Sequence, residues 1–274
     1  MTGLVRLLGL DFADMDVAEA AAFLAARPAS QPFGYVVTPN ADHLVRLHRQ
    51  PELRPLYAGA LLCLLDSRVV CRAARLFGLR APRIAPGSDL TETLLRQVAP
   101  GERITIVGLR AAWLAALVAR HRLAAPAHYD PPLGFERDPA AMRAAVDFVL
   151  AHPARFVFLA VGSPRQEMLA AAIAATGHAT GIGLCIGASL DFLSGAAPRA
   201  PVWLQRAGLE WLHRLAHDPL RLARRYLLDS PAIFPLLWRV GGRVGADRKP
   251  APTRPNTTRH PGSSRSASRQ RAPR

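Results

Sequence analysis

The feature that most constrains this sequence is a series of short, almost wholly apolar runs, each of which ends in a polar or glycine-containing turn. A helical stretch rich in Ala, Leu and Arg generally follows each turn. Strands that are apolar on both faces are typical of a parallel sheet that helices cover on both sides. The runs therefore predict an α/β fold, a Rossmann-like layered domain with a mostly parallel sheet. We expect strands at residues 35–37, 61–65, 104–107, 156–161 and 183–186.

Composition divides the 274 residues into three zones. Residues 1–200 carry the strand and helix pattern and form the predicted core. Residues 201–241 are rich in Trp, Leu and Arg and predict a C-terminal helical appendage, in which Pro219 separates a helix that ends near His217 from the next one. Residues 242–274 are dominated by Pro, Ser, Thr and Arg and contain few large apolar side chains, which predicts a disordered basic tail.

The chain is basic, with 35 Lys and Arg against 20 Asp and Glu and a formal net charge of +15. Because part of this excess lies in the tail, the charge favours attraction to phosphates or anionic lipid over a nucleic-acid-binding body. Cys63, Cys71 and Cys185 have no CxxC or metal-ligand spacing and predict reduced thiols in a cytosolic protein. The first residues lack a secretory signal pattern, and no apolar run reaches the ~18 residues of a membrane-spanning helix.

Polar side chains follow the first two predicted strands, at the carboxyl ends where parallel sheets bind ligands. Thr38-Pro39-Asn40 follows the first strand, and Thr38 fits either a helix cap or a group that contacts a phosphate or sugar. Asp66 follows the second strand. A partly desolvated carboxylate there suits a general base, whereas a helix cap or an ion pair with Arg68 is the structural alternative.

A Gly87-Ser88-Asp89 turn opens a predicted helix at Leu90. Asp89 and Glu92 fit a capping box, in which each side chain accepts a backbone N–H at the start of the helix. The same turn presents free amides and the nearby Arg83 to an anion. The capping and anion-binding interpretations are compatible.

The turn of residues 162–167 also fits both a helix cap and an anion-binding site. Ser163 at the cap, Pro164 at the first helical position and Gln166 at the third fit a capping box. Because Arg165 follows a strongly apolar strand here, the turn also fits a site for a nucleotide diphosphate. The glycines of residues 181–187 miss the GxGxxG spacing of a dinucleotide fingerprint.

Asp14-Met15-Asp16 matches a DxD pattern that can hold a divalent metal on a nucleotide-sugar diphosphate. It directly precedes a predicted helix over residues 17–26, and a helix N-cap explains it more simply. The histidines show no metal-ligand spacing, so the residues predict no metal site.

Taken together and in order, these strand ends resemble the WecG/TagA/CpsF glycosyltransferase family, glycosyltransferase family 26. The resemblance covers roughly residues 5–230. The matching segments are Thr38-Pro39-Asn40, Asp66 after its buried strand, and residues 87–90, 162–167, 187–195, 199–204 and 208–212.

The resemblance implies an inverting, non-processive transferase that works on the inner face of the cell membrane as a peripheral protein. Such enzymes move a sugar, of the N-acetylmannosamine type or a related hexose, from a UDP-sugar to a sugar on undecaprenyl diphosphate. Their products include teichoic acid linkage units, enterobacterial common antigen and exopolysaccharides. The resemblance implies neither a metal nor a cofactor, so arginines and helix N-termini are expected to stabilise the departing UDP.

By this resemblance Asp66 is the catalytic base that deprotonates the acceptor hydroxyl. The other residues expected to bind substrate, including phosphate-binding arginines of an appendage that closes over the site, are Thr38, Asn40, Arg83, Ser88, Gln166, Arg214, Arg221 and Arg225. Family members often follow the aspartate with Gly-x-Gly, whereas here Ser67 and Arg68 follow it. If Arg68 points inward, it favours ionised Asp66 and can bind an acidic sugar or a phosphate.

The appendage also offers leucines and aromatic residues beside its arginines, which predicts docking on an anionic membrane surface. Two ordinary amphipathic helices with solvated arginines are the structural alternative. An alternative function is a nucleotide-cofactor-binding enzyme of the same layered fold, an oxidoreductase or methyltransferase, although the fingerprint is missing. A nucleic-acid-binding module is disfavoured, because the dense basic run is confined to the tail. The sequence is compatible with an oligomer.

Overall fold

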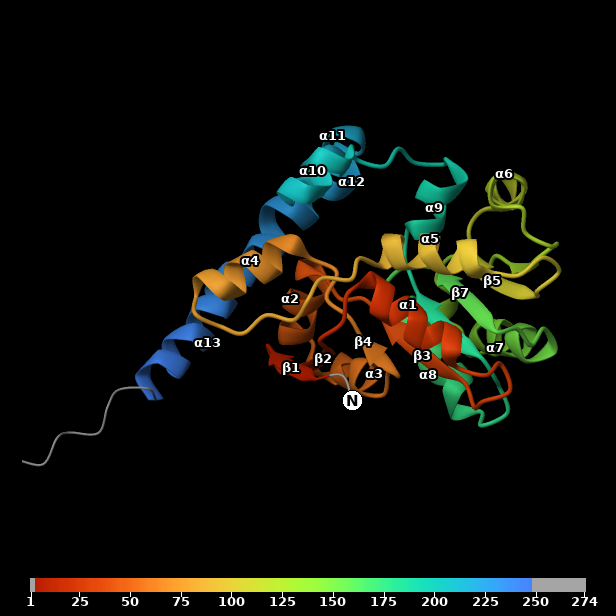
Figure 1. The fold of residues 1–274 in the computed structure, drawn as a ribbon, viewed down its shortest axis with the longest axis horizontal. Coiled ribbons are helices and arrows are strands. Elements are labelled where there is room, and N and C mark those ends of the chain that lie inside the picture. Colours follow the sequence, from red (N-terminus) through yellow and green to blue (C-terminus); the bar gives the residue numbers. More distant parts are fainter. Residues whose placement is uncertain (1–2, 248–274) are drawn as a thin grey trace, which may run out of the picture.

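The fold was described from a computed structural model, which covers residues 3–247 except for the side chains of residues 221 and 243–247. Within these residues, six parallel strands form one sheet in the order β4-β3-β8-β7-β5-β6. Figure 1 shows the helices that surround this sheet. The strands are β3 (Gly34–Val37), β4 (Leu62–Cys63), β5 (Ile104–Gly108), β6 (Ala127–Tyr129), β7 (Phe156–Ala160) and β8 (Ile182–Cys185). The predicted parallel α/β sheet is confirmed, and all of the predicted strands are present.

Alternate side chains of each central strand enter hydrophobic clusters on opposite faces of the sheet. In β7, Phe156 and Phe158 belong to one cluster, whereas Val157 and Leu159 belong to the other. On the first face lie α1 (Val17–Ala26), α5 (Gly87–Gln97), α6 (Ala111–His121) and α9 (Ser189–Ser194). On the second face lie α2 (Ala41–Arg49), α3 (Arg54–Ala58), α4 (Arg68–Leu76), α7 (Pro139–Ala151) and α8 (Arg165–Ala175).

An antiparallel hairpin precedes the sheet and was not predicted. Strands β1 (Leu4–Leu7) and β2 (Leu10–Ala13) pair through a two-residue turn, and β2 packs beside β4. Both turn residues, Leu8 and Gly9, have positive φ angles of 51° and 84°. Such turns usually carry Asn or Asp at the first position, so leucine there hides the hairpin from sequence analysis.

The helix starts correct several capping predictions. Asn40, and not Thr38, is the N-cap of α2, where its side chain accepts the backbone N–H of Asp42. α5 begins at Gly87, directly after Pro86, so the predicted capping box at Asp89 is wrong. α8 begins at Arg165 with Pro164 in the cap position, which makes the capping box predicted for Ser163 wrong as well. The capping explanation of the DxD pattern is confirmed, because Asp16 and Glu19 form a capping box on α1.

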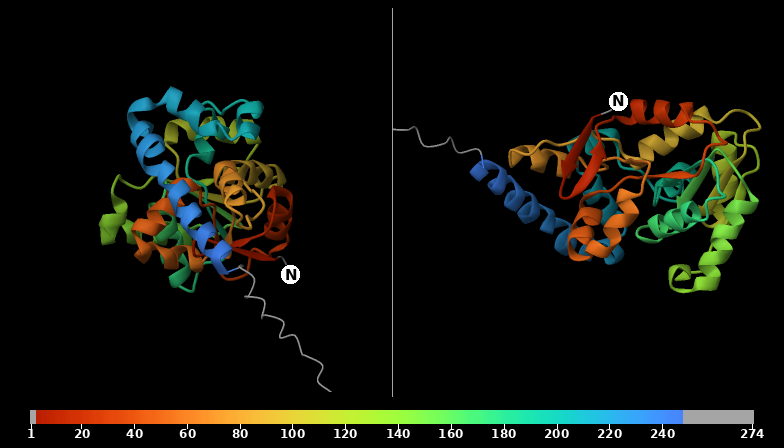
Figure 2. Two further views of the ribbon diagram at one scale, coloured as in Figure 1. Left: turned by 90° about the vertical axis from the view of Figure 1, so that its left-hand side faces the viewer. Right: turned by 90° about the horizontal axis from the view of Figure 1, so that it is seen from below.

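The appendage consists of short helices and one long one (Figure 2). They are α10 (Val202–Ala207), α11 (Glu210–His217), α12 (Pro219–Ala223), the π-helical turn η3 (Arg224–Asp229), the 3-10 turn η4 (Ser230–Ala232) and α13 (Ile233–Asp247). The break predicted at Pro219 is confirmed. None of the described helices is long and apolar enough to cross a membrane.

α13, which begins within the predicted appendage, packs against the core. Ile233 and Leu237 are 1% and 0% exposed and belong to the hydrophobic cluster on the second face of the sheet. α13 packs against α4 and α2 and continues to Asp247, past the predicted start of the tail at residue 242. The rest of that predicted tail, residues 248–274, lies outside the described residues.

Candidate active site

A cleft of about 430 Å³ opens beyond the carboxyl ends of β3 and β4 and is covered by the appendage. The backbone N–H of Asp66 donates to the carbonyl of Pro39 over 3.1 Å, which joins the two strand ends. Asn40, Asp66, Arg214 and Arg225 are among the residues that line the cleft. The structure therefore brings together four of the residues predicted for the site.

Asp66 is half-buried, and opposing charges act on its carboxylate. Burial and the neighbouring Glu210 carboxylate raise the pKa of Asp66 to about 7. Arg214 and a backbone hydrogen bond from Gly87 act against this rise by favouring the ionised form. Gly87 is the first residue of α5, so the positive end of that helix lies near the carboxylate. A carboxylate with a pKa near neutrality is suited to accept a proton during a reaction.

Thr38 packs against the first turn of α5. A Cβ atom on Gly87 would lie 2.7 Å from Oγ1 of Thr38, which is closer than real side chains approach. The missing side chain of Gly87 therefore allows the loop after β3 and the start of α5 to meet. Thr38 stands half-buried beside the glycine that donates to Asp66.

Two arginines reach the cleft from the appendage. Nη2 of Arg214 lies 2.9 Å from Oε1 of Glu210, and its guanidinium carbon lies 4.6 Å from the centre of the Phe192 ring. Nη2 of Arg225 lies 3.3 Å from Oδ2 of Asp42. In both side chains the Nε atom is buried without a partner among the described residues. Arg221 lies in α12, and its side chain is outside the described part of the structure.

The residues that replace the family's glycines begin α4. Ser67 is the N-cap and accepts the backbone N–H of Val70 over 3.2 Å. Arg68 lines the cleft, but the cation that lowers the pKa of Asp66 is Arg214.

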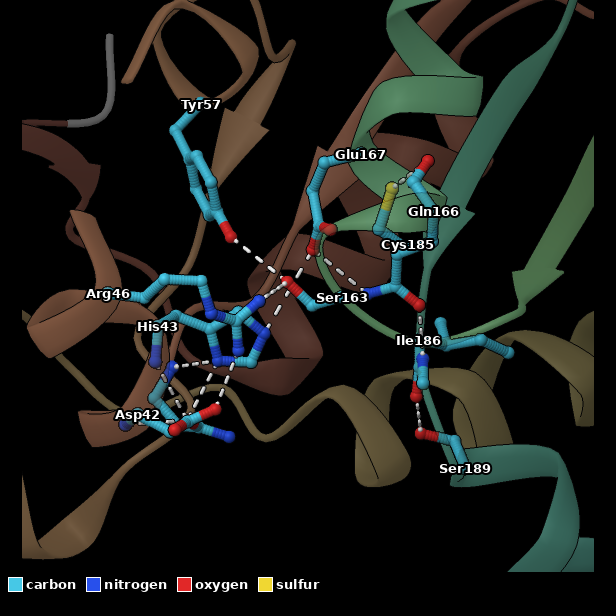
Figure 3. Close-up of polar contacts among 12 residues, drawn as sticks. Asp42, His43, Arg46, Tyr57, Ser163, Gln166, Glu167, Cys185, Ile186 and Ser189 are labelled. Carbon is cyan, nitrogen blue, oxygen red and sulfur yellow. Dashed lines mark hydrogen bonds and ion pairs between the residues drawn. The ribbon is translucent and has the colours of Figure 1, made fainter. Parts of the chain in front are cut away.

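Gln166 is not among the residues that line the cleft and belongs to the buried polar cluster of Figure 3. Its side chain is 3% exposed. Nε2 donates to Oε1 of Glu167 over 3.0 Å, and Oε1 accepts the backbone N–H of Gly187 over 2.8 Å. Gln166 thus ties α8 to the turn that follows β8, and both polar atoms of its amide have partners inside the protein.

Glu167 and His43 occupy the centre of this cluster (Figure 3). Nε2 of His43 lies 4.0 Å from Oε1 of Glu167. Burial raises the pKa of Glu167 and lowers the pKa of His43, and both effects favour the neutral side chains. Arg46 connects the cluster to the cleft, since it donates to Ser163 over 3.0 Å and to Asp42 over 2.7 Å.

Two other predicted residues lie apart from the residues that line the cleft. The Arg83 guanidinium is exposed and pairs with Glu19 over 2.5 Å and with Asp16 over 3.4 Å. Oγ of Ser88 is buried and accepts a hydrogen bond from Arg199 over 3.1 Å. The described residues contain no group of three or more His, Cys, Asp and Glu side chains that could hold a metal ion. Cys63, Cys71 and Cys185 are free, buried thiols.

A model of the glycosyl transferase WecG/TagA/CpsF family matches residues 5–244 of the chain. The chain belongs to this family. It is therefore a glycosyltransferase, of a family that serves cell-surface polysaccharide synthesis. The match covers the sheet, the cleft and the appendage, so both sides of the cleft lie within the family region.

In this WecG/TagA/CpsF member, some of the residues that form the cleft had not been singled out from the sequence. Asp42 holds both Arg46 and Arg225, and Glu210 pairs with Arg214. The signal available was the spacing of four residues, which places Asp42 with Arg46, and Glu210 with Arg214, on one side of a helix. That signal is weak, because the same spacing is common on solvated helices.

Proposed function

We propose that this chain transfers a sugar from a UDP-sugar to a sugar carried on undecaprenyl diphosphate, with inversion at the anomeric carbon. The acceptor hydroxyl oxygen forms a bond to the anomeric carbon while the bond from that carbon to the UDP phosphate oxygen breaks. Asp66 accepts the hydroxyl proton as the general base. The transferred sugar is of the N-acetylmannosamine type or a related hexose.

The observation that carries this proposal is the position and electrostatics of Asp66. Its carboxylate lines a cleft at the carboxyl edge of a parallel sheet and has a pKa of about 7. At neutral pH a large fraction of such groups is ionised, and each remains basic enough to take a proton. Arg214 and Arg225 line the same cleft and can compensate the charge of a diphosphate.

The other predicted residues support this reaction in different ways. We infer that Thr38 and Asn40 contact a substrate directly, since both lie at the end of β3 beside Asp66. Gln166 and Ser88 are buried and act indirectly, by fixing the turns that surround the substrates. Arg221 is proposed to join the phosphate-binding arginines. Arg83 reaches a phosphate only when its ion pairs with Asp16 and Glu19 open.

We further propose that the chain attaches to the anionic inner face of the cell membrane through the appendage. Large apolar side chains are exposed there beside arginines, a combination that binds lipid interfaces. The exposed apolar residues of α10–α13 are Val202, Trp203, Leu209, Leu212, Leu220, Leu227, Leu228, Phe234 and Trp238.

The substitution Asp66→Asn tests the assignment of the base, because it keeps the shape of the side chain and removes its basicity. We expect turnover to fall about 100-fold or more, the usual scale of general base catalysis, while donor binding changes little. Sugar transfer from a panel of UDP-sugars to a short-chain diphosphate-lipid acceptor, measured by mass spectrometry, reads out the reaction. UDP binding by calorimetry reads out the donor site.

The matched control is Asp130→Asn, an exposed aspartate in the loop after β6. It should leave turnover unchanged. Near-normal turnover of the Asp66→Asn enzyme would show that another group accepts the proton.

A further inference from the structure

A second concavity of about 610 Å³ lies between α5, α6, α9 and the segment that leads to α10. Among the described residues that line it, four are arginines, namely Arg96, Arg120, Arg122 and Arg199. They come from three separate parts of the chain, and we refer to this concavity as the arginine basin. No described residue lines both the arginine basin and the catalytic cleft.

The arginine basin carries more positive than negative charge. Oε1 of Glu92 lies 2.5 Å from Arg96, and Oε2 lies 3.2 Å from Arg199, which also pairs with Asp89. Arg120 and Arg122 have no carboxylate partner among the described residues. Nη1 of Arg120 donates to the carbonyl of Leu193 over 3.2 Å, which positions this side chain and leaves its other N–H groups available. The remaining donors of Arg120 and the guanidinium of Arg122 can face an anion, and the planar fork of a guanidinium matches the oxygens of a phosphate.

The backbone at Arg122 gives independent support. Arg122 ends α6 in the left-handed conformation, with φ 53° and ψ 40°. This position normally favours glycine or asparagine, because a longer side chain is strained there. Strained residues of this kind concentrate at functional sites. The negative end of the α6 dipole accounts for a cation at this helix end, but it does not account for Arg96 and Arg199, which belong to other segments.

Apolar and unpaired polar groups complete the arginine basin. Phe192 and Leu193 from α9 form an apolar wall beside the guanidinium groups. The Nε atom of Arg199 is buried without a hydrogen-bond partner among the described residues. Burial lowers the pKa of His121, so this side chain is neutral at pH 7 and can both donate and accept a hydrogen bond.

We propose that the arginine basin is a second anion site, which binds the phosphate of a phosphate-bearing ligand between Arg120 and Arg122. Phe192 lines the same concavity and offers an apolar surface to an organic group carried by the ligand. The face of the same ring is covered by Arg214 of the catalytic cleft. A ligand in the basin therefore contacts a side chain that supports the cleft.

The test is calorimetry with inorganic pyrophosphate and the full chain at physiological ionic strength. Arg122→Gly removes one guanidinium and suits the left-handed backbone, so we expect about tenfold weaker binding with an unchanged or higher Tm. Arg120→Gln should weaken binding to a similar degree. Arg143→Gln, on α7 at the opposite face of the sheet, is the matched control and should bind as the wild type does.

Pyrophosphate can also bind in the catalytic cleft. Arg225 lines the cleft and not the basin, so Arg225→Gln shows how much of the measured binding occurs in the cleft. Binding that survives Arg225→Gln and is about tenfold weaker in Arg122→Gly supports the arginine basin. Undetectable binding to the wild-type chain, or binding that is lost in Arg225→Gln and kept in both basin variants, would overturn the proposal. Flotation with phosphatidylcholine vesicles, with and without phosphatidic acid, identifies the source of the phosphate. If the phosphate belongs to a lipid headgroup, binding to vesicles that contain phosphatidic acid requires Arg122. If the ligand is soluble, vesicle binding does not depend on Arg122.

Discussion

At the scale of single residues, the reactivity of Asp66 depends on side chains of α11 that act with opposite signs. Glu210 raises the pKa of Asp66 and Arg214 lowers it, and the two side chains also pair with each other. Asp89 of α5 acts in the same direction as Glu210, and Arg68 of α4 also lines the cleft. Burial is the largest cause of the raised pKa of Asp66. Because Glu210 and Arg214 belong to the appendage, its position also contributes to the basicity of this core residue.

Substitutions in this pair should shift the pH dependence of the reaction in opposite directions. The proposed base works when ionised, so kcat/KM of the wild type should rise with pH through about 7. Glu210→Gln removes a negative charge and frees Arg214 to stabilise ionised Asp66, so the acid limb should move to lower pH by roughly one unit. Arg214→Gln should move it to higher pH. The measurement is kcat/KM between pH 5 and 9, and identical acid limbs in all three enzymes would contradict the assignment.

The raised pKa of Asp66 also predicts a stability effect. The pKa is 3.8 in the unfolded reference and about 7 in the fold, so the native state prefers the protonated carboxyl. The favourable contribution of protonated Asp66 to the free energy of unfolding is therefore fully present below about pH 4. It is lost as the pH rises through about 7, because the folded protein must then hold a buried charge. Asp66→Asn cannot ionise, so it should raise the Tm at pH 8 by about 3 °C or more and change it little at pH 4. Calorimetric scans at both pH values check this, with Asp130→Asn as the exposed control.

The sequence sufficed to predict where Asp66 lies, because a lone carboxylate after an apolar run marks the end of a buried strand, whereas its role as the base comes from the family resemblance. The sequence did not predict the surroundings of Gln166 or Arg83. Gln166 is held by Glu167 and Gly187, and Arg83 is held by Glu19, and these partners are set by tertiary packing. A strand-end motif therefore predicts where a residue lies, but not which of its atoms remain free.

At the scale of secondary-structure elements, the appendage is held against the core by polar contacts as well as by α13. Arg72 of α4 donates to the carbonyls of Ala207 and Arg206, over 2.6 and 2.7 Å, at the end of α10. Further along the chain, Arg49 of α2 lies 2.5 Å from Asp229 of η3. These contacts tie α10 and η3, two segments of the appendage, to helices of the core.

Removing the Arg72 contacts should loosen α10 without unfolding the core. Arg72→Gln loses charged donors to two helix-terminal carbonyls, worth about 1 kcal/mol together at an exposed site. We expect amide hydrogen exchange in α10 and α11 to become about fivefold faster, while exchange in the sheet stays unchanged. Arg75→Gln is the control, since Arg75 is an exposed arginine on the same helix. Equal exchange in the two variants would mean that α10 is held by other contacts.

Elements were predictable where burial gave them a continuous apolar signal. The central strands β5 and β7 are almost entirely buried and were found. β6 lies at the edge of the sheet, its three residues are only half-buried, and its Ala-His-Tyr sequence gives no such signal. The helix starts were misplaced for a different reason, because Asn40 and Thr38 are both capable caps and the tertiary contact of Thr38 with Gly87 decides between them.

At the scale of the whole molecule, the last helix of the appendage, α13, packs against the core. Ile233, Leu236 and Leu237 fill the hydrophobic cluster on the second face of the sheet. A chain that ends at residue 200 would leave this space empty and expose the apolar side chains around it. Membrane attachment is therefore better tested with substitutions of exposed side chains than by deleting the appendage.

Serine substitutions at Leu220, Leu228 and Trp238 provide that test. These side chains are 98%, 69% and 64% exposed, so replacing them leaves the packing of the core intact and the Tm close to that of the wild type. Interfacial binding scales with the apolar area that enters the lipid, so we expect the triple variant to lose about tenfold or more in affinity for vesicles containing phosphatidylglycerol. Cosedimentation measures this affinity. Leu133→Ser is the matched control, because Leu133 is 93% exposed but lies outside the appendage. If the triple variant sediments with vesicles as the control does, its three exposed side chains do not dock on the bilayer, and the charge of the arginines would have to account for any attachment.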